Sequence, residues 1–111
     1  MSIKDTVKAS LLQSFPGEDL LEETYTLIAQ LEYPSYLIRI TNTTESDLFI
    51  SFDGRHDHEF IAYADVLKLY APAAHGTVVP FFPEGMKIYA KGCACDSGTI
   101  YISSYYNPLG K

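Results

Sequence analysis

The chain has 111 residues, a length that fits one domain and excludes a two-domain enzyme. Hydrophobic residues make up 47% of it, which is enough for a folded core without disulfide or metal staples. Because 8 Lys and Arg stand against 14 Asp and Glu, with a formal net charge of −6, we expect no phosphate-neutralising surface and no nucleic-acid partner.

The first residues carry apolar side chains at a helical spacing. Ile3, Val7 and Leu11 follow an i, i+4, i+8 pattern and predict a short helix within residues 1–15. The apolar stripe is too narrow for a helix that stands alone, so it must dock on its own domain or on a neighbouring subunit. With the acidic turn that follows Gly17, residues 1–23 are predicted to form an N-terminal arm, helical or extended.

The rest of the chain shows the two-residue alternation of half-buried strands. Polar turns separate the alternating segments, as at residues 42–47, Asp53-Gly54 and residues 92–98. Six to eight short strands at a spacing of about 8–14 residues predict a mainly β protein, an antiparallel β-sandwich or jelly-roll over residues 24–111. The expected strands cover residues 24–30, 36–41, 48–53, 59–63, 66–70, 86–91 and 100–105.

Targeting and redox signals are sparse. Cys93 and Cys95 are separated by one residue, which makes a ring too tight for an ordinary disulfide and indicates a reducing compartment. The start of the chain lacks the apolar core of a signal peptide, and no apolar run approaches the roughly 20 residues of a membrane span. We therefore expect synthesis in the cytoplasm and no membrane partner.

A polar cluster between two predicted strands raises the question of metal binding. His56 and His58, two residues apart, would point to the same side of a strand, and Cys93 and Cys95 would complete a four-ligand set. However, Cys-x-Cys lacks the usual spacer, and nothing in the sequence brings the two segments together. These four residues are weak candidates, and the prediction is no metal and no cofactor. The competing interpretation is a hydrogen-bonded turn at the rim of the sandwich, with Asp57 accepting from local backbone amides.

The catalytic motifs that the sequence would need are absent. There is no Gly-x-Ser-x-Gly elbow, no phosphate-binding loop with a Lys, and no His-Glu-x-x-His helix. The protein is predicted not to be an enzyme, with no catalytic residue.

Tyrosine is the unusual feature of the composition, with nine in the chain. Tyr89, Tyr101 and Tyr105 fall opposite the aliphatic residues of their strands, and such a face favours docking onto another protein unless a second sheet or the arm covers it. Residues 78–82 form a second apolar patch, suited to an extended segment that adds to a neighbouring sheet. The predicted partner interface comprises Ile3, Val7, Leu11, Phe81, Phe82, Tyr89, Tyr101 and Tyr105.

Several short motifs resemble a family of small β-sandwich proteins from tailed-phage virions. These motifs are a strand ending in Asn-x-Thr at residues 42–44, Ser-x-Asp-Gly at residues 51–54, the Asp57-His58 pair, and the segments 82–91 and 98–106. The resemblance covers roughly residues 24–106 and is greatest to the capsid-decorating staple proteins of short-tailed phages of the epsilon-fifteen type. The chain departs from the pattern at residues 62–65, where such proteins often have a Pro-Ala-Gly turn.

The resemblance implies a mechanical role in the virion. It implies a protein on the outer capsid surface that bridges neighbouring major capsid subunits and resists the pressure of packaged DNA. We expect a homodimer on the capsid, because two-fold pairs are the commonest symmetric assembly. Two alternatives stay open, namely a head-to-tail connector or tail accessory protein, and a small metal- or carbohydrate-binding sandwich.

Overall fold

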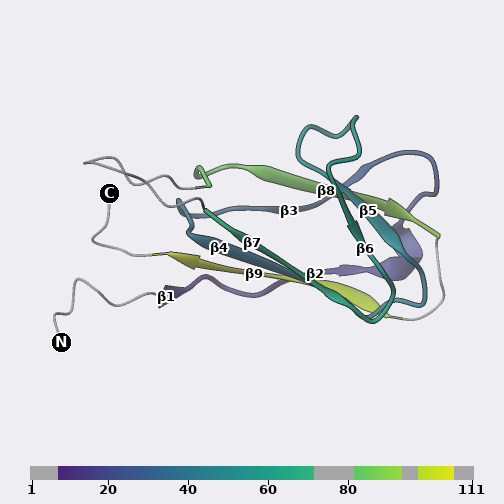
Figure 1. The fold of residues 1–111 in the computed structure, drawn as a ribbon, viewed down its shortest axis with the longest axis horizontal. Coiled ribbons are helices and arrows are strands. Elements are labelled where there is room, and N and C mark those ends of the chain that lie inside the picture. Colours follow the sequence, from purple (N-terminus) through teal and green to yellow (C-terminus); the bar gives the residue numbers. More distant parts are fainter. Residues whose placement is uncertain (1–7, 72–81, 94–97, 107–111) are drawn as a thin grey trace, which may run out of the picture.

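The computed structural model describes residues 8–71, 82–93 and 98–106. It confirms the mainly β prediction, because nine strands within these residues form two antiparallel sheets that pack face to face as a sandwich (Figure 1). The one helical element among the described residues is a single 3-10 turn, η2 (Gly17–Asp19). No helix within these residues has the length and apolar character needed to cross a membrane.

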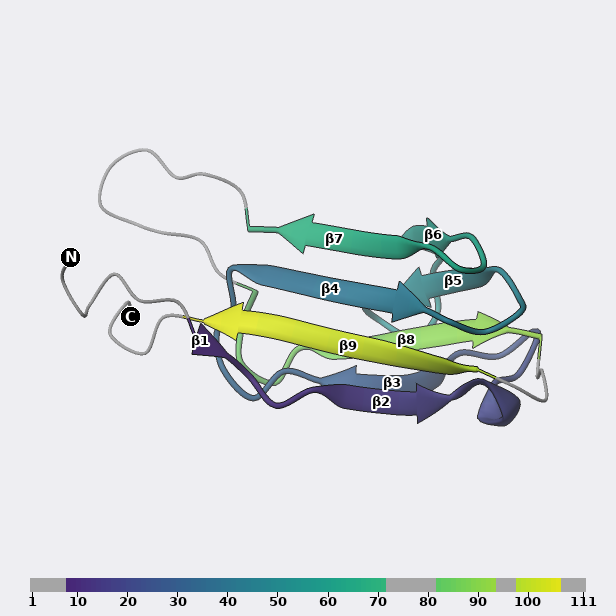
Figure 2. The same cartoon turned by 90° about the horizontal axis from the view of Figure 1, so that it is seen from below.

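The first sheet, sheet A, has the order β1-β9-β4-β7, and β2 also pairs with β9. Figure 2 shows this sheet in front, with β1 and β2 one after the other along the same edge of β9. Its strands are β1 (Lys8–Ala9), β2 (Gln13–Pro16), β4 (Leu37–Asn42), β7 (Val66–Tyr70) and β9 (Thr99–Tyr106).

The second sheet, sheet B, has the order β3-β8-β5-β6. Its strands are β3 (Thr26–Gln30), β5 (Leu48–Ser51), β6 (Glu59–Ile61) and β8 (Lys87–Gly92). From β2 onward the chain crosses between the sheets at every connection except the β5–β6 hairpin. The strand orders β2-β9-β4-β7 and β3-β8-β5-β6 are those of an eight-stranded jelly-roll, in which two Greek keys wrap around one core.

The core lies between the sheets and consists of the inward residue of each alternating pair. Burial alternates along β4, where Ile38 and Ile40 are fully buried, and along β9, where Ile100 and Ile102 are buried. β-branched side chains suit this pleated surface. Each such side chain contributes about 1.5–3 kcal/mol when it is removed from water. The buried hydrophobic cluster comprises Leu20, Ile28, Ala29, Leu31, Ile38, Ile40, Leu48, Ile50, Ile61, Ile88, Ala90, Ile100 and Ile102.

The N-terminal segment corrects one prediction. The expected helix is wrong for residues 8–15, because β1 and β2 are extended and pair with β9. Leu11 is 79% exposed, whereas Phe15 packs against the core and Leu20, at 1% exposure, belongs to it. The described part of this segment therefore forms strands of the sandwich. Ile3 and Val7 lie outside the described residues.

The Gln13 side chain forms strand-like hydrogen bonds with the backbone at one edge of the sandwich. The Nε2 of Gln13 donates to the backbone oxygen of Gln30 (2.8 Å), and the backbone N–H of Gln30 donates to Oε1 of Gln13 (3.2 Å). This pair of bonds joins β2 of sheet A to the open edge of β3 in sheet B. Edge groups paired in this way are no longer available to another chain.

Two connections at one end of the sandwich meet at Asn42. Its Nδ2 donates to the backbone oxygens of Ser46 (2.8 Å) and Ala62 (3.2 Å), while its Oδ1 accepts from the backbone N–H (2.9 Å) and the hydroxyl (2.6 Å) of Thr44. Asn42 is 1% exposed, so these bonds satisfy both ends of a buried amide. They tie the β4–β5 turn to the connection between β6 and β7.

Candidate docking surface

The outer face of sheet A is an open surface of nine side chains, three each from β7, β4 and β9. Within each of these strands the outward residues alternate with the core residues. In Figure 2 no described segment crosses in front of these three strands. We call this surface the sheet A face; its residues are Val66, Lys68, Tyr70, Leu37, Arg39, Thr41, Tyr101, Ser103 and Tyr105.

Strand register arranges the sheet A face in three rows. Leu37 lies between Tyr70 and Tyr105 in the first row. Arg39 lies between Lys68 and Ser103 in the second. Thr41 lies between Val66 and Tyr101 in the third. The two basic residues therefore occupy the middle row, with tyrosine-containing rows on both sides.

The tyrosines of the sheet A face present their rings to solvent to different degrees. Tyr70 is 67% exposed and Tyr101 is 37% exposed, while Tyr105 is half-buried. The Tyr105 hydroxyl lies 3.5 Å from Nη2 of Arg39, at the outer limit of a hydrogen bond. Tyrosine rings combine apolar area with a polar tip, which suits a surface that is wet in one state and covered in another.

The charges of this face are all positive. Arg39 and Lys68 are directly opposite each other across β4 and β7, an arrangement of like charges that destabilises a sheet pair. Neither forms an ion pair with any described residue, and the buried Nε of Arg39 has no hydrogen-bond partner there. None of the nine residues is acidic, although the chain has 14 Asp and Glu.

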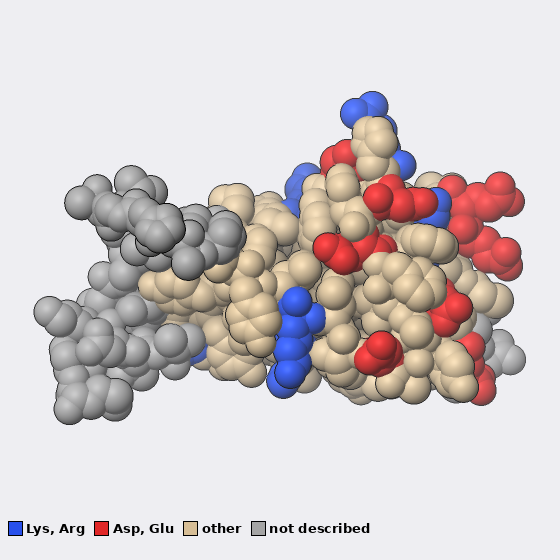
Figure 3. All heavy atoms as spheres, viewed as in Figure 1, with Lys and Arg blue, Asp and Glu red and all other residues tan. Residues whose placement is uncertain are grey.

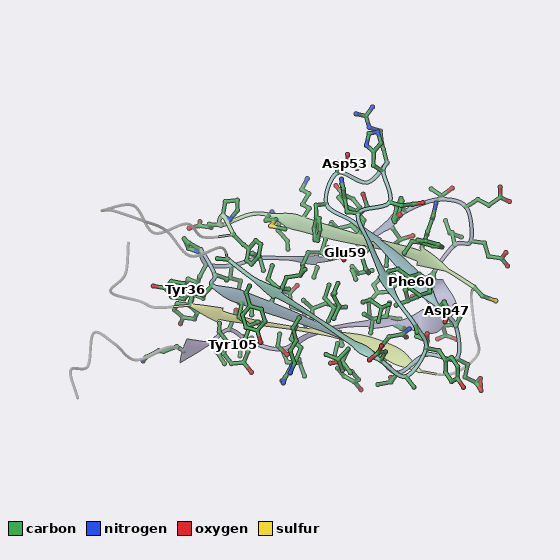
Figure 4. All side chains as sticks on the ribbon, in the orientation of Figure 1. Tyr36, Asp47, Asp53, Glu59, Phe60 and Tyr105 are labelled. Carbon is green, nitrogen blue, oxygen red and sulfur yellow. The ribbon has the colours of Figure 1, made fainter. Side chains whose placement is uncertain are left out.

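Sheet B carries a smaller aromatic patch on its own outer face. Phe49 and Phe60 are cross-strand partners, with an edge-to-face ring pair at 5.3 Å between centroids, and are 40% and 50% exposed. The Nζ of Lys91 lies 4.8 Å from the centre of the Tyr25 ring and 5.8 Å from that of Phe49. Figure 4 labels Phe60 on the β6 strand and Tyr105 on β9, in opposite sheets.

The loop that holds the predicted histidine cluster is organised by Asp53. Its Oδ1 accepts from the backbone N–H groups of Arg55 (2.8 Å) and His56 (2.9 Å), and its Oδ2 lies 2.6 Å from Nδ1 of His56. These bonds, with the His56 backbone N–H first, hold the pKa of the Asp53 carboxyl well below its usual range. The loop is a hydrogen-bonded turn whose backbone amides bond to Asp53, and not to Asp57 as predicted.

Asp57 instead joins the loop to sheet B. It accepts from the hydroxyl of Tyr25, and one of its oxygens lies 3.2 Å from Nζ of Lys91. These two contacts, that with Tyr25 being the larger cause, lower the pKa of Asp57. For Tyr25, burial is the first cause of a raised pKa and the bond to Asp57 is the second.

The described metal candidates, His56, His58 and Cys93, do not form one site. Nδ1 of His58 accepts from the backbone N–H of Phe52 (3.0 Å), and its Nε2 is 4.0 Å from Asp53. Cys93 follows the end of β8 that pairs with Leu48, whereas the histidine loop leaves the other end of β5. Within residues 8–71, 82–93 and 98–106, no group of three or more His, Cys, Asp or Glu could hold a metal ion. Cys95 lies outside these ranges.

The three tyrosines predicted to share one interface are divided between the two sheets. Tyr101 and Tyr105 lie on the sheet A face, but Tyr89 belongs to sheet B. The histidine loop passes over Tyr89, since a Cβ on Gly54 would lie 3.2 Å from its ring. Tyr89 is therefore half-covered by its own chain.

The other predicted interface residues lie elsewhere. Phe82 is half-buried, packs against the core, and forms a β-bridge with Ser35. Leu11 is exposed beside the β1–β2 edge. Ile3, Val7 and Phe81 lie outside the described residues. Sequence reasoning missed Arg39, Lys68 and Tyr70; the alternation in residues 66–70 marked the outward positions of β7, but not its pairing with β4.

Comparison with known proteins does not assign the chain to a family. No protein-family model matches the chain, and no curated protein matches it. A solved structure from work on Bacillus endospore appendages, described as a novel family of disulfide-linked pili, is similar over 92% of this chain and 88% of that chain, with a TM-score of 0.45 and 11% sequence identity. A likeness of this extent carries no argument about the fold or the function.

Proposed function

We propose that this protein is a non-enzymatic structural component of a tailed-phage virion. In this proposal it decorates the outer capsid surface and staples neighbouring major capsid subunits, which stabilises the shell against DNA pressure. It is made in the host bacterial cytoplasm and acts on the virion, with the major capsid protein as its partner.

The observation that carries the proposal is the open sheet A face. Three of its nine side chains are tyrosines, and no described segment covers them. Tyrosine and arginine are enriched at protein interfaces, while an isolated monomer gains nothing from keeping such rings in water. The face is the outer surface of a sheet, as suits contact with another folded surface better than enclosure of a small substrate.

A staple must hold two neighbours, and the sandwich offers a second surface for that purpose. The Phe49–Phe60 pair lies on sheet B, so its partner would approach from the side opposite the sheet A face. Each contact is small, but repetition over a shell lets many weak contacts act together. Alternatively, one surface contacts the shell and the other a second copy, which would give the homodimer expected on the capsid.

The motif resemblance supports the same proposal from the sequence. Its segments fall on or next to β4, β5, β8 and β9, which are the inner strands of the two sheets, except for the Asp57-His58 pair in the β5–β6 loop. Fold alone does not establish a function, so the proposal rests on the motifs and the open face together.

The test is to mix the purified protein with empty capsid shells that lack it and to image the product by electron cryomicroscopy. Density repeated over the shell lattice supports a decoration protein, and density that spans two capsid subunits supports stapling. Density at one vertex alone would make it a connector or tail accessory protein. Absence of binding would overturn the capsid proposal and return attention to a metal- or carbohydrate-binding sandwich.

A further inference from the structure

We infer that the sheet A face binds an acidic segment of its protein partner, with a carboxylate seated between Arg39 and Lys68. That the partner belongs to a capsid rests on the proposed function. The acidic chemistry rests on the face itself.

Arg39 lacks hydrogen-bond partners for part of its guanidinium group. Its Nε is buried and has no hydrogen-bond partner among the described residues, and its Nη2 has only the 3.5 Å contact with Tyr105. A buried N–H without an acceptor is costly, and a guanidinium fits a carboxylate through two parallel N–H···O bonds. Because Nε itself has almost no accessible surface, a partner carboxylate over Arg39 would accept from the terminal Nη groups and so bring the guanidinium a strong acceptor.

Arg39 and Lys68 repel each other across β4 and β7. The two residues are directly opposite each other, and neither has an acidic neighbour on the face or an ion pair with any described residue. An anion placed between them converts that repulsion into two attractions. A positive site of this kind selects a negative partner group.

Two rows of other side chains flank the pair. The rows on both sides supply Tyr70, Leu37 and Tyr105 on one flank, and Val66, Thr41 and Tyr101 on the other. A partner segment that matches these rows carries a carboxylate between apolar side chains. Two basic residues are too few for a nucleic-acid backbone, whose binding needs many phosphate contacts.

The rest of the molecule disfavours acidic partners elsewhere. Figure 3 shows acidic side chains gathered at the end of the molecule that carries η2. With a net charge of −6, the protein repels an acidic segment except at a local positive site. Charge thus fixes where and how the partner docks.

The experiment is a titration of the full-length protein with a synthetic peptide in which glutamate alternates with valine. Binding is monitored by NMR. Amide shifts on β4, β7 and β9 are expected, and they should diminish as salt is added. Arg39→Gln and Lys68→Gln should each weaken binding by about tenfold. Lys87→Gln is the matched control, because Lys87 is an exposed lysine on sheet B and its loss should leave binding unchanged.

A conservative variant at Arg39 serves as the control for loss of folding. Arg39→Lys keeps the charge and loses the planar fork, so it should bind more weakly than the wild type and more tightly than Arg39→Gln, with an unchanged unfolding transition. Equal binding by a peptide with glutamine in place of glutamate would overturn the inference. The inference would also be overturned if the protein self-associates and Glu22→Gln with Glu23→Gln abolishes this self-association. In that case the sheet A face would bind a second copy of this chain.

Capsid shells lacking the protein separate this inference from the proposed function. Wild-type protein that binds shells with the same affinity as Arg39→Gln and Lys68→Gln refutes the inference and leaves the function standing. Wild-type protein that ignores shells, yet binds the acidic peptide through the sheet A face, refutes the capsid proposal and supports the inference.

Discussion

Replacing Gly98 by alanine is the sharpest test of how the sandwich end is built. Gly98 has a φ of +95° just before β9, and its backbone oxygen accepts from the N–H of Gly17 (3.1 Å). A Cβ at Gly98 would lie 2.4 Å from the backbone oxygen of Thr43 and 2.5 Å from Cα of Thr44. Those atoms belong to backbone, so they cannot rotate away as the end of a side chain would.

The expected cost has two parts. A left-handed backbone conformation costs a non-glycine residue about 1–2 kcal/mol. Forcing an extra carbon into packed backbone adds about 1–3 kcal/mol. Gly98→Ala should therefore destabilise the fold by about 2–5 kcal/mol. Gly85→Ala is the matched control, because Gly85 has a φ of +83° but a Cβ there would meet only Nε2 of Gln30, at 3.8 Å. Gly85→Ala should lower the free energy of unfolding only by the conformational cost of about 1–2 kcal/mol.

Urea unfolding of the wild type and both variants, followed by circular dichroism, measures this difference. A midpoint shift with an unchanged slope reports stability alone. If Gly98→Ala and Gly85→Ala lose the same free energy of unfolding, the close approach of β9 to residues 43–44 does not hold in solution.

Three further changes test other parts of the fold. Ala64 has a φ of +61°, so Ala64→Gly should raise the free energy of unfolding by about 0.5–1 kcal/mol in the same urea assay, since relief of strain exceeds the added unfolded-state entropy. Because the pKa of Asp53 is lowered in the folded state, its ionised carboxylate stabilises the fold at pH values above the ordinary aspartate pKa of about 4. This stability is lost as the pH falls below that value. Asp53→Asn should therefore flatten the acid limb of a curve of Tm against pH. Gln13→Ala removes the bonds that close the β3 edge, so amide exchange at Gln30 should accelerate by about fivefold, a rise that an unchanged rate would contradict.

Most of the fold could be predicted from the sequence because the core strands carry strong local signals. Ile38 and Ile40 in β4, like Ile100 and Ile102 in β9, alternate with outward residues over the full strand. Each of these pairs is both β-branched and buried, so intrinsic preference and burial point the same way. The seven predicted strands correspond to β3 through β9.

The N-terminal strands could not be predicted in this way. Leu11 fits a helical spacing with Ile3 and Val7, but the register of residues 13–16 is set by β9, which lies more than eighty positions later. A hydrogen-bonding edge of an eight-residue strand outweighs the weak helical preference of a short segment. The signal that was overlooked is Phe15, whose alternation with Ser14 is that of a strand.

Only part of the candidate site could be predicted, because the rest depends on long-range strand pairing. The alternation placed Tyr89, Tyr101 and Tyr105 on outward positions, and the structure agrees. Which of them share a surface depends on strand order, and this long-range property separates Tyr89 from the other two. The proximity of Arg39 and Lys68 could not be predicted, because the two residues become neighbours only when β7 pairs with β4.

Three residues of the motifs behind the phage resemblance stabilise the fold, whereas the motif segment 98–106 also carries Tyr101 and Tyr105 of the sheet A face. Asn42 bridges two connections, Ser51 accepts from the backbone N–H of Gly54 (3.0 Å), and Gly85 supplies a left-handed turn whose N–H donates to Leu31 (2.9 Å). None of these residues belongs to the sheet A face. Related sandwiches can therefore keep these three residues and change the partner, because docking depends on side chains such as Arg39 and Lys68 that the three do not constrain.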